Sequence, residues 1–212
     1  MNSELTELIV ILDASGSMMK RKQDVIGGFN QLIDDQRLQP GQCVVTVVQF
    51  SSFGKQRTIV NRKTPSEVAY LTDADYRPGG WTALHDAICS VIDEAGTQLA
   101  NLPECDRPGK VIVAVITDGA ENHSQEYTVS QVRDKVQHQR DTYSWEFLFT
   151  GANQDAVLTG GSLGVSANLS ATYRDTSRGY RKAMRGVSYA TSALRHNDAE
   201  AACMAMDSIK DG

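Results

Sequence analysis

Long apolar runs and basic blocks are both missing from this chain of 212 residues. The apolar run in its first strand candidate, 8–12, is far short of the ~20 residues that a membrane-spanning helix needs. Glu4 and Glu7 stand where a secretory leader would carry positive charge, so we expect no leader and a cytoplasmic protein. The net charge of −5 argues against a nucleic-acid binder that works by neutralising phosphates.

Cysteine is also sparse, and its spacing argues against common cysteine-based sites. The sequence has four cysteines and no C-x-x-C pair, which disfavours a thiolate zinc site. They are Cys43, Cys89, Cys105 and Cys203. A chain of this length can bury a full core without disulfides, so we expect reduced thiols and one domain.

Six short apolar stretches predict the strands of a sheet: 8–12, 43–50, 57–61, 111–116, 145–149 and 169–173. The runs at 8–12 and 111–116 are continuous, which is typical of strands covered on both faces. The second and third stretches are separated by a short turn at Gly54, so they must pair antiparallel, because a parallel return needs about a dozen residues.

Amphipathic helices separate these strands, with apolar stripes in 25–33, 84–99, 129–136 and 180–194. The segment Thr64-Pro65-Ser66-Glu67 has the form of a helix start with a capping box. The order predicts an α/β fold: a doubly wound, mostly parallel six-stranded sheet with one antiparallel edge strand and helices on both faces. We expect a single domain over 1–197, followed by a tail at 198–212 that is either helical or frayed.

Polar side chains follow the two most apolar strands. Asp13, Ser15 and Ser17 alternate on the exit loop of the first strand, and Asp118 ends the run at 111–116. In an open α/β sheet, ligands bind at the carboxyl ends of strands where the strand order reverses. If these two strands are neighbours, carboxylates and hydroxyls form an all-oxygen set. Such a set suits Mg²⁺, Mn²⁺ or Ca²⁺ and does not suit zinc.

A glycine turn supplies a third segment, Gly79-Gly80-Trp81-Thr82-Ala83-Leu84, and places Thr82 near the start of a long helix. Together, D-x-S-x-S, G-G-x-T-A-L and T-D-G resemble the metal-ion-dependent adhesion site of von Willebrand factor A domains. The resemblance extends from about Leu5 to about Leu194, and the chain resembles compact cytosolic members of the family from bacteria and their viruses.

The resemblance implies a function that does not involve catalysis. Asp13, Ser15, Ser17, Thr82 and Asp118 would surround a divalent cation, Mg²⁺ with Mn²⁺ or Ca²⁺ as alternatives. An Asp or Glu side chain of a partner protein would then complete the coordination. A homotypic contact, in which the acidic side chain comes from a second copy, is one version of this hypothesis.

Residues beside the expected site have two interpretations each. Trp81 stands where many family members have a third glycine, so it is either a partner contact or a side chain packed over the helix start. His123 follows Asp118 on the same loop and, with Glu121, is either solvated or touches a partner. Asn153 and Asp155 end the fifth strand at the same edge and could support the site.

Two other function classes compete with the binding module. A Mg²⁺-dependent phosphoryl-transfer or hydrolytic enzyme could use Asp13, but the dehalogenase-type phosphatases would want an aspartate where Ser15 stands. A scaffold domain with a vestigial site is the other alternative, against which the five intact oxygen ligands argue. We also expect exposed loops at the site and a solvated helix face at Lys20-Arg21-Lys22.

Overall fold

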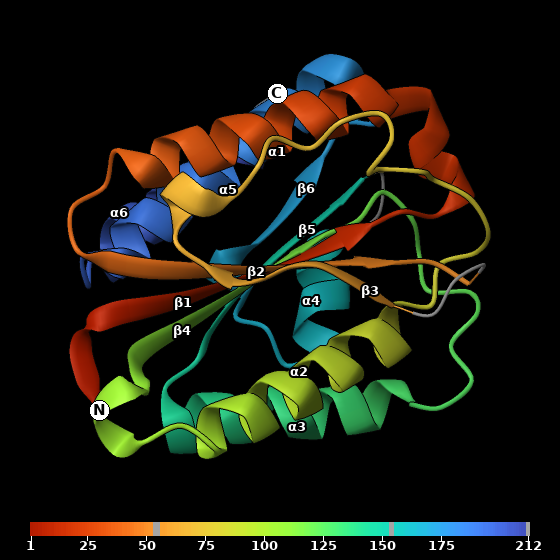
Figure 1. The fold of residues 1–212 in the computed structure, drawn as a ribbon. Coiled ribbons are helices and arrows are strands. Elements are labelled where there is room, and N and C mark those ends of the chain that lie inside the picture. Colours follow the sequence, from red (N-terminus) through yellow and green to blue (C-terminus); the bar gives the residue numbers. More distant parts are fainter. Residues whose placement is uncertain (53–55, 153–154, 211–212) are drawn as a thin grey trace.

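The sheet has six strands in the order β3-β2-β1-β4-β5-β6, and helices cover both of its faces (Figure 1). The computed structural model describes residues 1–52, 56–152 and 155–210, so Gly54 lies outside the described residues. β2 and β3 pair antiparallel, and the other neighbours pair parallel. This confirms the doubly wound fold with an antiparallel edge strand. The strands are β1 (Asn2–Asp13), β2 (Gln42–Phe50), β3 (Arg57–Lys63), β4 (Pro108–Ile116), β5 (Glu146–Ala152) and β6 (Ser170–Tyr173).

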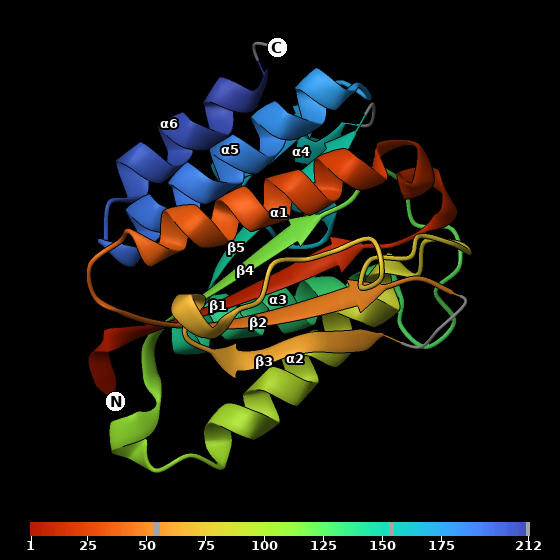
Figure 2. The ribbon, with the colours of Figure 1, turned by 45° about the horizontal axis from the view of Figure 1, so that its top comes forward.

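Two layers of helices enclose the sheet. α1 (Lys22–Arg37), α5 (Ser177–Arg195) and α6 (Ala199–Lys210) lie side by side on one face (Figure 2). α2 (Leu84–Ala100), α3 (Val129–Tyr143) and the short α4 (Ala156–Ser162) lie on the other face (Figure 1). Short 3₁₀ helices are η1 (Gly16–Arg21), η2 (Pro65–Glu67), η3 (Glu104–Asp106) and η4 (Ala167–Leu169).

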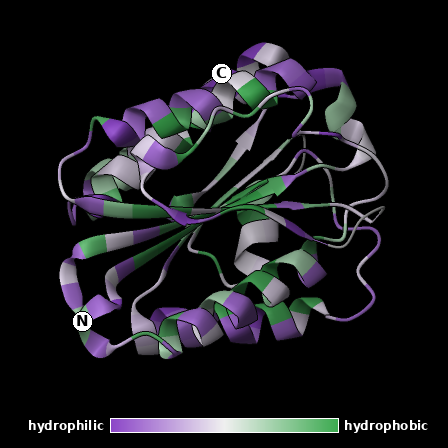
Figure 3. Cartoon of the chain, in the orientation of Figure 1, coloured by the Kyte–Doolittle hydropathy of each residue, from purple (hydrophilic) through white to green (hydrophobic). Residues whose placement is uncertain are grey.

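The core lies along the central strands. Every side chain from Leu8 to Leu12 in β1 is fully buried, and β4 is buried from Val111 to Ile116. Figure 3 shows the hydrophobic strands between helices whose outer faces are hydrophilic. Continuous burial explains why these strands have no polar alternation, because a helix layer covers each face.

The strand order reverses at β1. The chain leaves β1 for β2 and β3 on one side, then returns through α2 to β4 on the other side, where Leu12 is paired with Ile116. The carboxyl ends of β1 and β4 are therefore neighbours. Asp13 and the turn that begins at Thr117 emerge together at this topological switch point, where ligands bind in open α/β sheets.

The helix predicted from Thr64 is wrong beyond its first turn. The capping box forms, but only the 3₁₀ turn Pro65–Glu67 follows it. Side chains of α1 satisfy the backbone that a helix would otherwise satisfy. Asn30 bonds both the N–H and the C=O of Leu71, and Arg37 donates to the carbonyls of Pro65 and Val68. This anchoring over α1 replaces helical hydrogen bonds.

The described part of the C-terminal stretch that the sequence left undecided is a helix. α6 packs on α5 and β6 through Ala202, Met206 and Ile209, which are buried. Gly186 of α5 permits this close crossing, since a Cβ built there would lie 2.4 Å from Ile209 Cγ1. The described part of the predicted tail is thus packed against the helical layer.

Candidate metal centre

Asp13 is the last residue of β1, and its side chain is fully buried. Its Oδ1 accepts a hydrogen bond from the Ser15 N–H at 2.7 Å, and its Oδ2 accepts one from Thr117 Oγ1 at 2.5 Å. The expectation of an exposed loop is therefore wrong for Asp13, because the strand continues to this residue. Burial raises the pKa of Asp13 to about 6, although both hydrogen bonds oppose that shift.

A chain of short contacts leads from Ser15 to Asp118. The hydroxyl oxygens of Ser15 and Ser17 are 3.0 Å apart, and Ser17 Oγ donates to Asp118 Oδ1 at 2.5 Å. The Asp118 side chain is only 1% exposed. Among the described residues, its Oδ2 has no hydrogen-bond partner. A buried carboxylate oxygen without a donor is one that a cation would stabilise.

Thr82 joins the same cluster from the loop before α2. It is buried, and a Cβ built on Gly119 would lie 3.1 Å from Thr82 Oγ1 and 3.8 Å from Ser17 Oγ. Both hydroxyls therefore face the turn that carries Asp118. The loop is fixed to the first segment because the Gly16 N–H donates to the Gly80 carbonyl at 2.9 Å. Gly80 has a φ of 78°, a conformation that favours glycine.

The donor set fits a hard divalent cation. The structure brings together five side chains from three segments: Asp13, Ser15, Ser17, Thr82 and Asp118. Two carboxylates and three hydroxyls are oxygen ligands of the kind that Mg²⁺ and Ca²⁺ accept. Within the described part of the chain, no group of three His, Cys, Asp or Glu side chains could hold a metal.

Sequence reasoning missed Arg21. The basic run at Lys20-Arg21-Lys22 is not wholly solvated, because the Arg21 side chain is 3% exposed and faces the site. Its Nε lies 3.4 Å from Asp118 Oδ2, and its Nη2 pairs with Asp175. Nothing in the local pattern separates Arg21 from Lys20 and Lys22, because its partners Asp118, Asp175 and Tyr180 are distant in sequence.

Three buried tyrosines contact residues of the site or of its immediate surroundings. Tyr76 Oη donates to the Asp13 carbonyl at 2.5 Å, and Tyr173 Oη donates to the Thr117 carbonyl at 2.9 Å. The Tyr180 ring lies beneath the Arg21 guanidinium, with the ring centroid 6.0 Å from Arg21 Cζ. Burial raises the pKa of all three phenols, so they remain neutral, and Tyr76 and Tyr173 act as hydrogen-bond donors. They come from distant segments, and no local motif identifies them.

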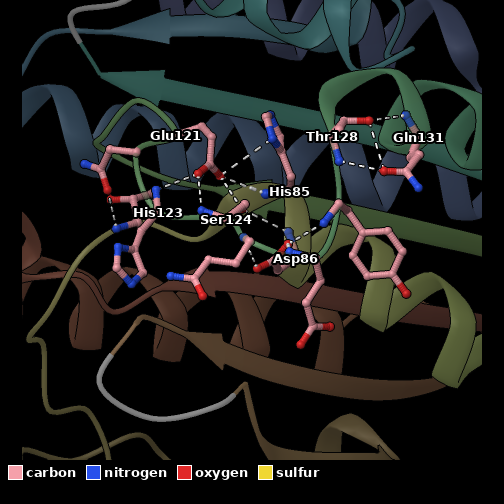
Figure 4. Close-up of polar contacts among 12 residues, drawn as sticks. His85, Asp86, Glu121, His123, Ser124, Thr128 and Gln131 are labelled. Atoms are coloured by element: carbon pink, nitrogen blue, oxygen red, sulfur yellow. Dashed lines mark hydrogen bonds and ion pairs between the residues drawn. The ribbon is translucent and has the colours of Figure 1, made fainter.

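The loop after Asp118 is held by two internal carboxylates (Figure 4). Glu121 accepts from the backbone N–H groups of His85, His123 and Ser124. Burial raises the pKa of Glu121, but these bonds and the Ser124 hydroxyl lower it by more. Asp86 accepts from the N–H groups of residues 125–127. The interpretation of Glu121 as a solvated loop residue is therefore wrong.

Trp81 and His123 lie at the rim. Trp81 is 61% exposed, while its backbone N–H donates to Ser52 Oγ at 2.7 Å. The backbone is thus fixed and the indole faces solvent. His123 is half-buried, and its ring points away from the Glu121 carboxylate in Figure 4. Asn153 lies outside the described residues, and Asp155 caps α4 by accepting from the Leu158 N–H.

The family model of the von Willebrand factor type A domain matches residues 7–158. The chain belongs to this family. Von Willebrand factor type A domains are mostly adhesion and protein-interaction modules. Among the described residues, no helix is both long and apolar enough to cross a membrane.

Solved structures show the same fold at low identity. Proximal thread matrix protein 1 from the mussel byssus matches with a TM-score of 0.61 and 16% identity, over 95% of this chain and 49% of that one. VWA2, the ArnB paralog of Sulfolobus acidocaldarius, matches with a TM-score of 0.55 and 15% identity, over 86% of this chain and 44% of that one. This chain thus spans about half the length of these proteins. No curated protein matches it.

Proposed function

We propose that this von Willebrand factor A domain is a protein-binding module that depends on a divalent cation. Asp13, Ser15, Ser17, Thr82 and Asp118 would hold the ion, with Mg²⁺ preferred and Mn²⁺ or Ca²⁺ as alternatives. An Asp or Glu side chain of a partner protein would complete the coordination. The observation that carries the proposal is the contact chain from Ser15 through Ser17 to Asp118 beside buried Asp13.

The donor chemistry supports an exchangeable site. Mg²⁺ keeps several water ligands when it is bound by one or two carboxylates, and such water can give way to a carboxylate from outside. Both protein carboxylates are nearly inaccessible to solvent, whereas Ser17 is exposed. A partner would therefore approach from the side of η1 and the loop before α2.

Exposed apolar groups beside the site support protein recognition. Trp81 and Met19 are 61% and 56% exposed, and their segments are joined by the Gly16–Gly80 hydrogen bond. Tryptophan is enriched among residues that dominate binding energy at interfaces. We assign Trp81, Met19 and the half-buried His123 to the partner interface, and a second copy of the chain is one candidate partner.

Hydrolytic alternatives have no comparable support. The Ser15 hydroxyl contacts that of Ser17 at 3.0 Å, and among the described residues no histidine hydrogen-bonds to either hydroxyl. We place the module in the cytoplasm, because all four cysteines of the described chain are free and a reducing compartment keeps thiols in that state.

Calorimetric titration of metal into the purified protein tests the proposal. The panel contains Mg²⁺, Mn²⁺, Ca²⁺ and Zn²⁺, the last because a structure of the mussel thread protein is described as having a zinc-occupied adhesion motif. We expect one saturable ion, lost in Asp118→Asn and Ser17→Ala. Asp73→Asn is the control, because Asp73 is an exposed carboxylate paired with Lys22. Equal binding by all variants would refute the site.

The partner is sought with the same variants. Chemical cross-linking in Mg²⁺ and in EDTA, followed by mass spectrometry, should identify a protein joined near Trp81 only when Mg²⁺ is present. Asp118→Asn should lose that cross-link, while Asp73→Asn keeps it. Analytical ultracentrifugation in Mg²⁺ tests whether the partner is a second copy of this chain. A monomer mass that does not change with protein concentration would exclude it.

A further inference from the structure

We propose that Arg21 is a built-in counter-cation of the metal centre, one that holds the Asp118 carboxylate and lowers the affinity of the site for a divalent cation. The inference rests on the proposed function, because it concerns the same carboxylate. Arg21 is thus a positioning residue, whose charge weakens the binding of the metal ion and strengthens the attraction of an anionic partner.

The geometry places a fixed positive charge beside a candidate ligand. Arg21 ends η1, and its Nε lies 3.4 Å from Asp118 Oδ2 with both side chains at most 3% exposed. Charges at this depth are poorly screened by solvent. The other edge of the guanidinium pairs with Asp175, immediately before the cap of α5. Arg21 is therefore fixed between the metal centre and α5.

The contact with Asp118 is electrostatic and leaves hydrogen-bonding capacity unused. Within the described chain, Asp118 Oδ2 and Arg21 Nε and Nη1 have no hydrogen-bond partner. Arg–carboxylate pairs are frequently bidentate, with two short parallel bonds. Here Asp118 Oδ2 is balanced by charge without a donated proton. This oxygen can therefore be stabilised by another cation without breaking a hydrogen bond.

The charges around the site give the direction of the effect. Asp13 and Asp118 supply two negative charges, and Arg21 supplies one positive charge that it shares with Asp175. Lys20 also pairs with Asp175, so the outer carboxylate is compensated twice. Without metal, Arg21 reduces repulsion between the buried carboxylates. With metal, its charge adds to that of the ion, which favours an incoming acidic side chain.

Two substitutions should change metal affinity in opposite directions. Arg21→Gln removes the competing charge, and we expect Mg²⁺ or Mn²⁺ to bind about tenfold more tightly. Asp175→Asn leaves the whole charge of Arg21 to act on Asp118, and we expect weaker binding by a similar factor. Arg181→Gln is the matched control, because Arg181 pairs with Asp24 at 2.7 Å between α5 and α1, outside the metal-ligand set. It should leave affinity unchanged.

Thermal melting separates this role from a packing role. Arg21→Gln should lower the Tm strongly in EDTA, where Asp13 and Asp118 repel each other, and much less in saturating Mg²⁺. A packing role over the Tyr180 ring would lower the Tm equally in both solutions. Circular dichroism checks the fold of each variant, and Asp175→Asn, whose side chain is 24% exposed, keeps the test decisive if Arg21→Gln does not fold.

The outcomes distinguish the two proposals. Unchanged or weaker metal binding in Arg21→Gln, or unchanged or tighter binding in Asp175→Asn, would overturn the role of Arg21 while Asp118→Asn still tests the site. If the wild-type chain shows no saturable metal binding at all, both proposals are overturned. Opposite shifts, with Arg181→Gln unchanged, support the counter-cation.

Discussion

The Thr117 hydroxyl donates to the Asp13 carboxylate at 2.5 Å and so joins the ends of β1 and β4. The Gly119 N–H donates to the same hydroxyl at 3.1 Å, which fixes the turn that carries Asp118. One side chain outside the candidate ligands therefore sets the spacing of the two strands at the switch point. The packing of the two strand ends therefore brings candidate ligands from both segments together.

Thr117→Val should weaken both the fold and the site. Valine has nearly the same shape, but it leaves Asp13 Oδ2 without its donor, and an unsatisfied buried acceptor costs about 1–3 kcal/mol. Urea unfolding in EDTA measures this loss, and a Mg²⁺ titration measures the site. Thr117→Ser keeps the hydroxyl and should retain most of the stability. A Val variant as stable as the Ser variant would contradict this role.

Metal binding should weaken as the pH falls below about 6. Burial raises the pKa of Asp13 to about 6 from an unfolded value of 3.8. A raised carboxyl pKa means that the folded chain holds the proton more tightly than the unfolded chain, so ionisation destabilises the metal-free fold as the pH rises from 3.8 to about 6. An ion that needs the ionised carboxylate must displace this proton.

Titrations of Mg²⁺ on both sides of that pKa check this expectation. The apparent affinity should be nearly constant at neutral pH and fall by about tenfold for each further pH unit in the acid range. Asp13→Asn should bind weakly with a flatter pH profile. An acid profile of the wild type that matches Asp13→Asn would show that another group titrates.

Gly119→Ala should reduce metal affinity with little loss of fold. The added Cβ would lie 3.1 Å from Thr82 Oγ1, tight enough to displace that hydroxyl by a few tenths of an ångström. Gly96→Ala is the matched control, because nothing lies within 4 Å of a Cβ there and alanine favours the helix by about 0.5–1 kcal/mol. Calorimetry should show weaker Mg²⁺ binding for Gly119→Ala alone.

Trp81→Ala should separate partner binding from metal binding. The indole is 61% exposed and only the backbone is held, so the change in unfolding free energy should stay within about 0.5 kcal/mol. Mg²⁺ titration should be unchanged, while the Mg²⁺-dependent cross-link is lost. Tyr143→Ala, 60% exposed at the end of α3, is the control for removing an exposed aromatic. Retained cross-linking in Trp81→Ala would exclude this contact.

The sequence predicted those parts of the molecule that local pattern determines. Apolar runs placed the strands, and the alternating Asp13, Ser15 and Ser17 placed the candidate site at a strand end. Arg21 and the three tyrosines could not be found in this way, because residues distant in sequence bury them. Burial of Asp13 was missed for a related reason: a turn-forming motif does not show how far the strand continues.

Gly186→Ala tests how closely α6 belongs to the domain. A Cβ at this position would lie 2.4 Å from Ile209 Cγ1 and 2.6 Å from its Cδ1, so alanine overpacks the α5–α6 crossing. Overpacking of this kind costs about 1–3 kcal/mol, more than alanine gains in helix propensity. Ile209→Ala removes both atoms and leaves space that the new methyl group fills. The double variant should therefore lose less stability than the two single losses added together. Strictly additive losses in urea unfolding would mean that the new methyl group does not meet Ile209. No loss in Gly186→Ala would mean that α6 can shift on α5 and that the close crossing is not required for the fold.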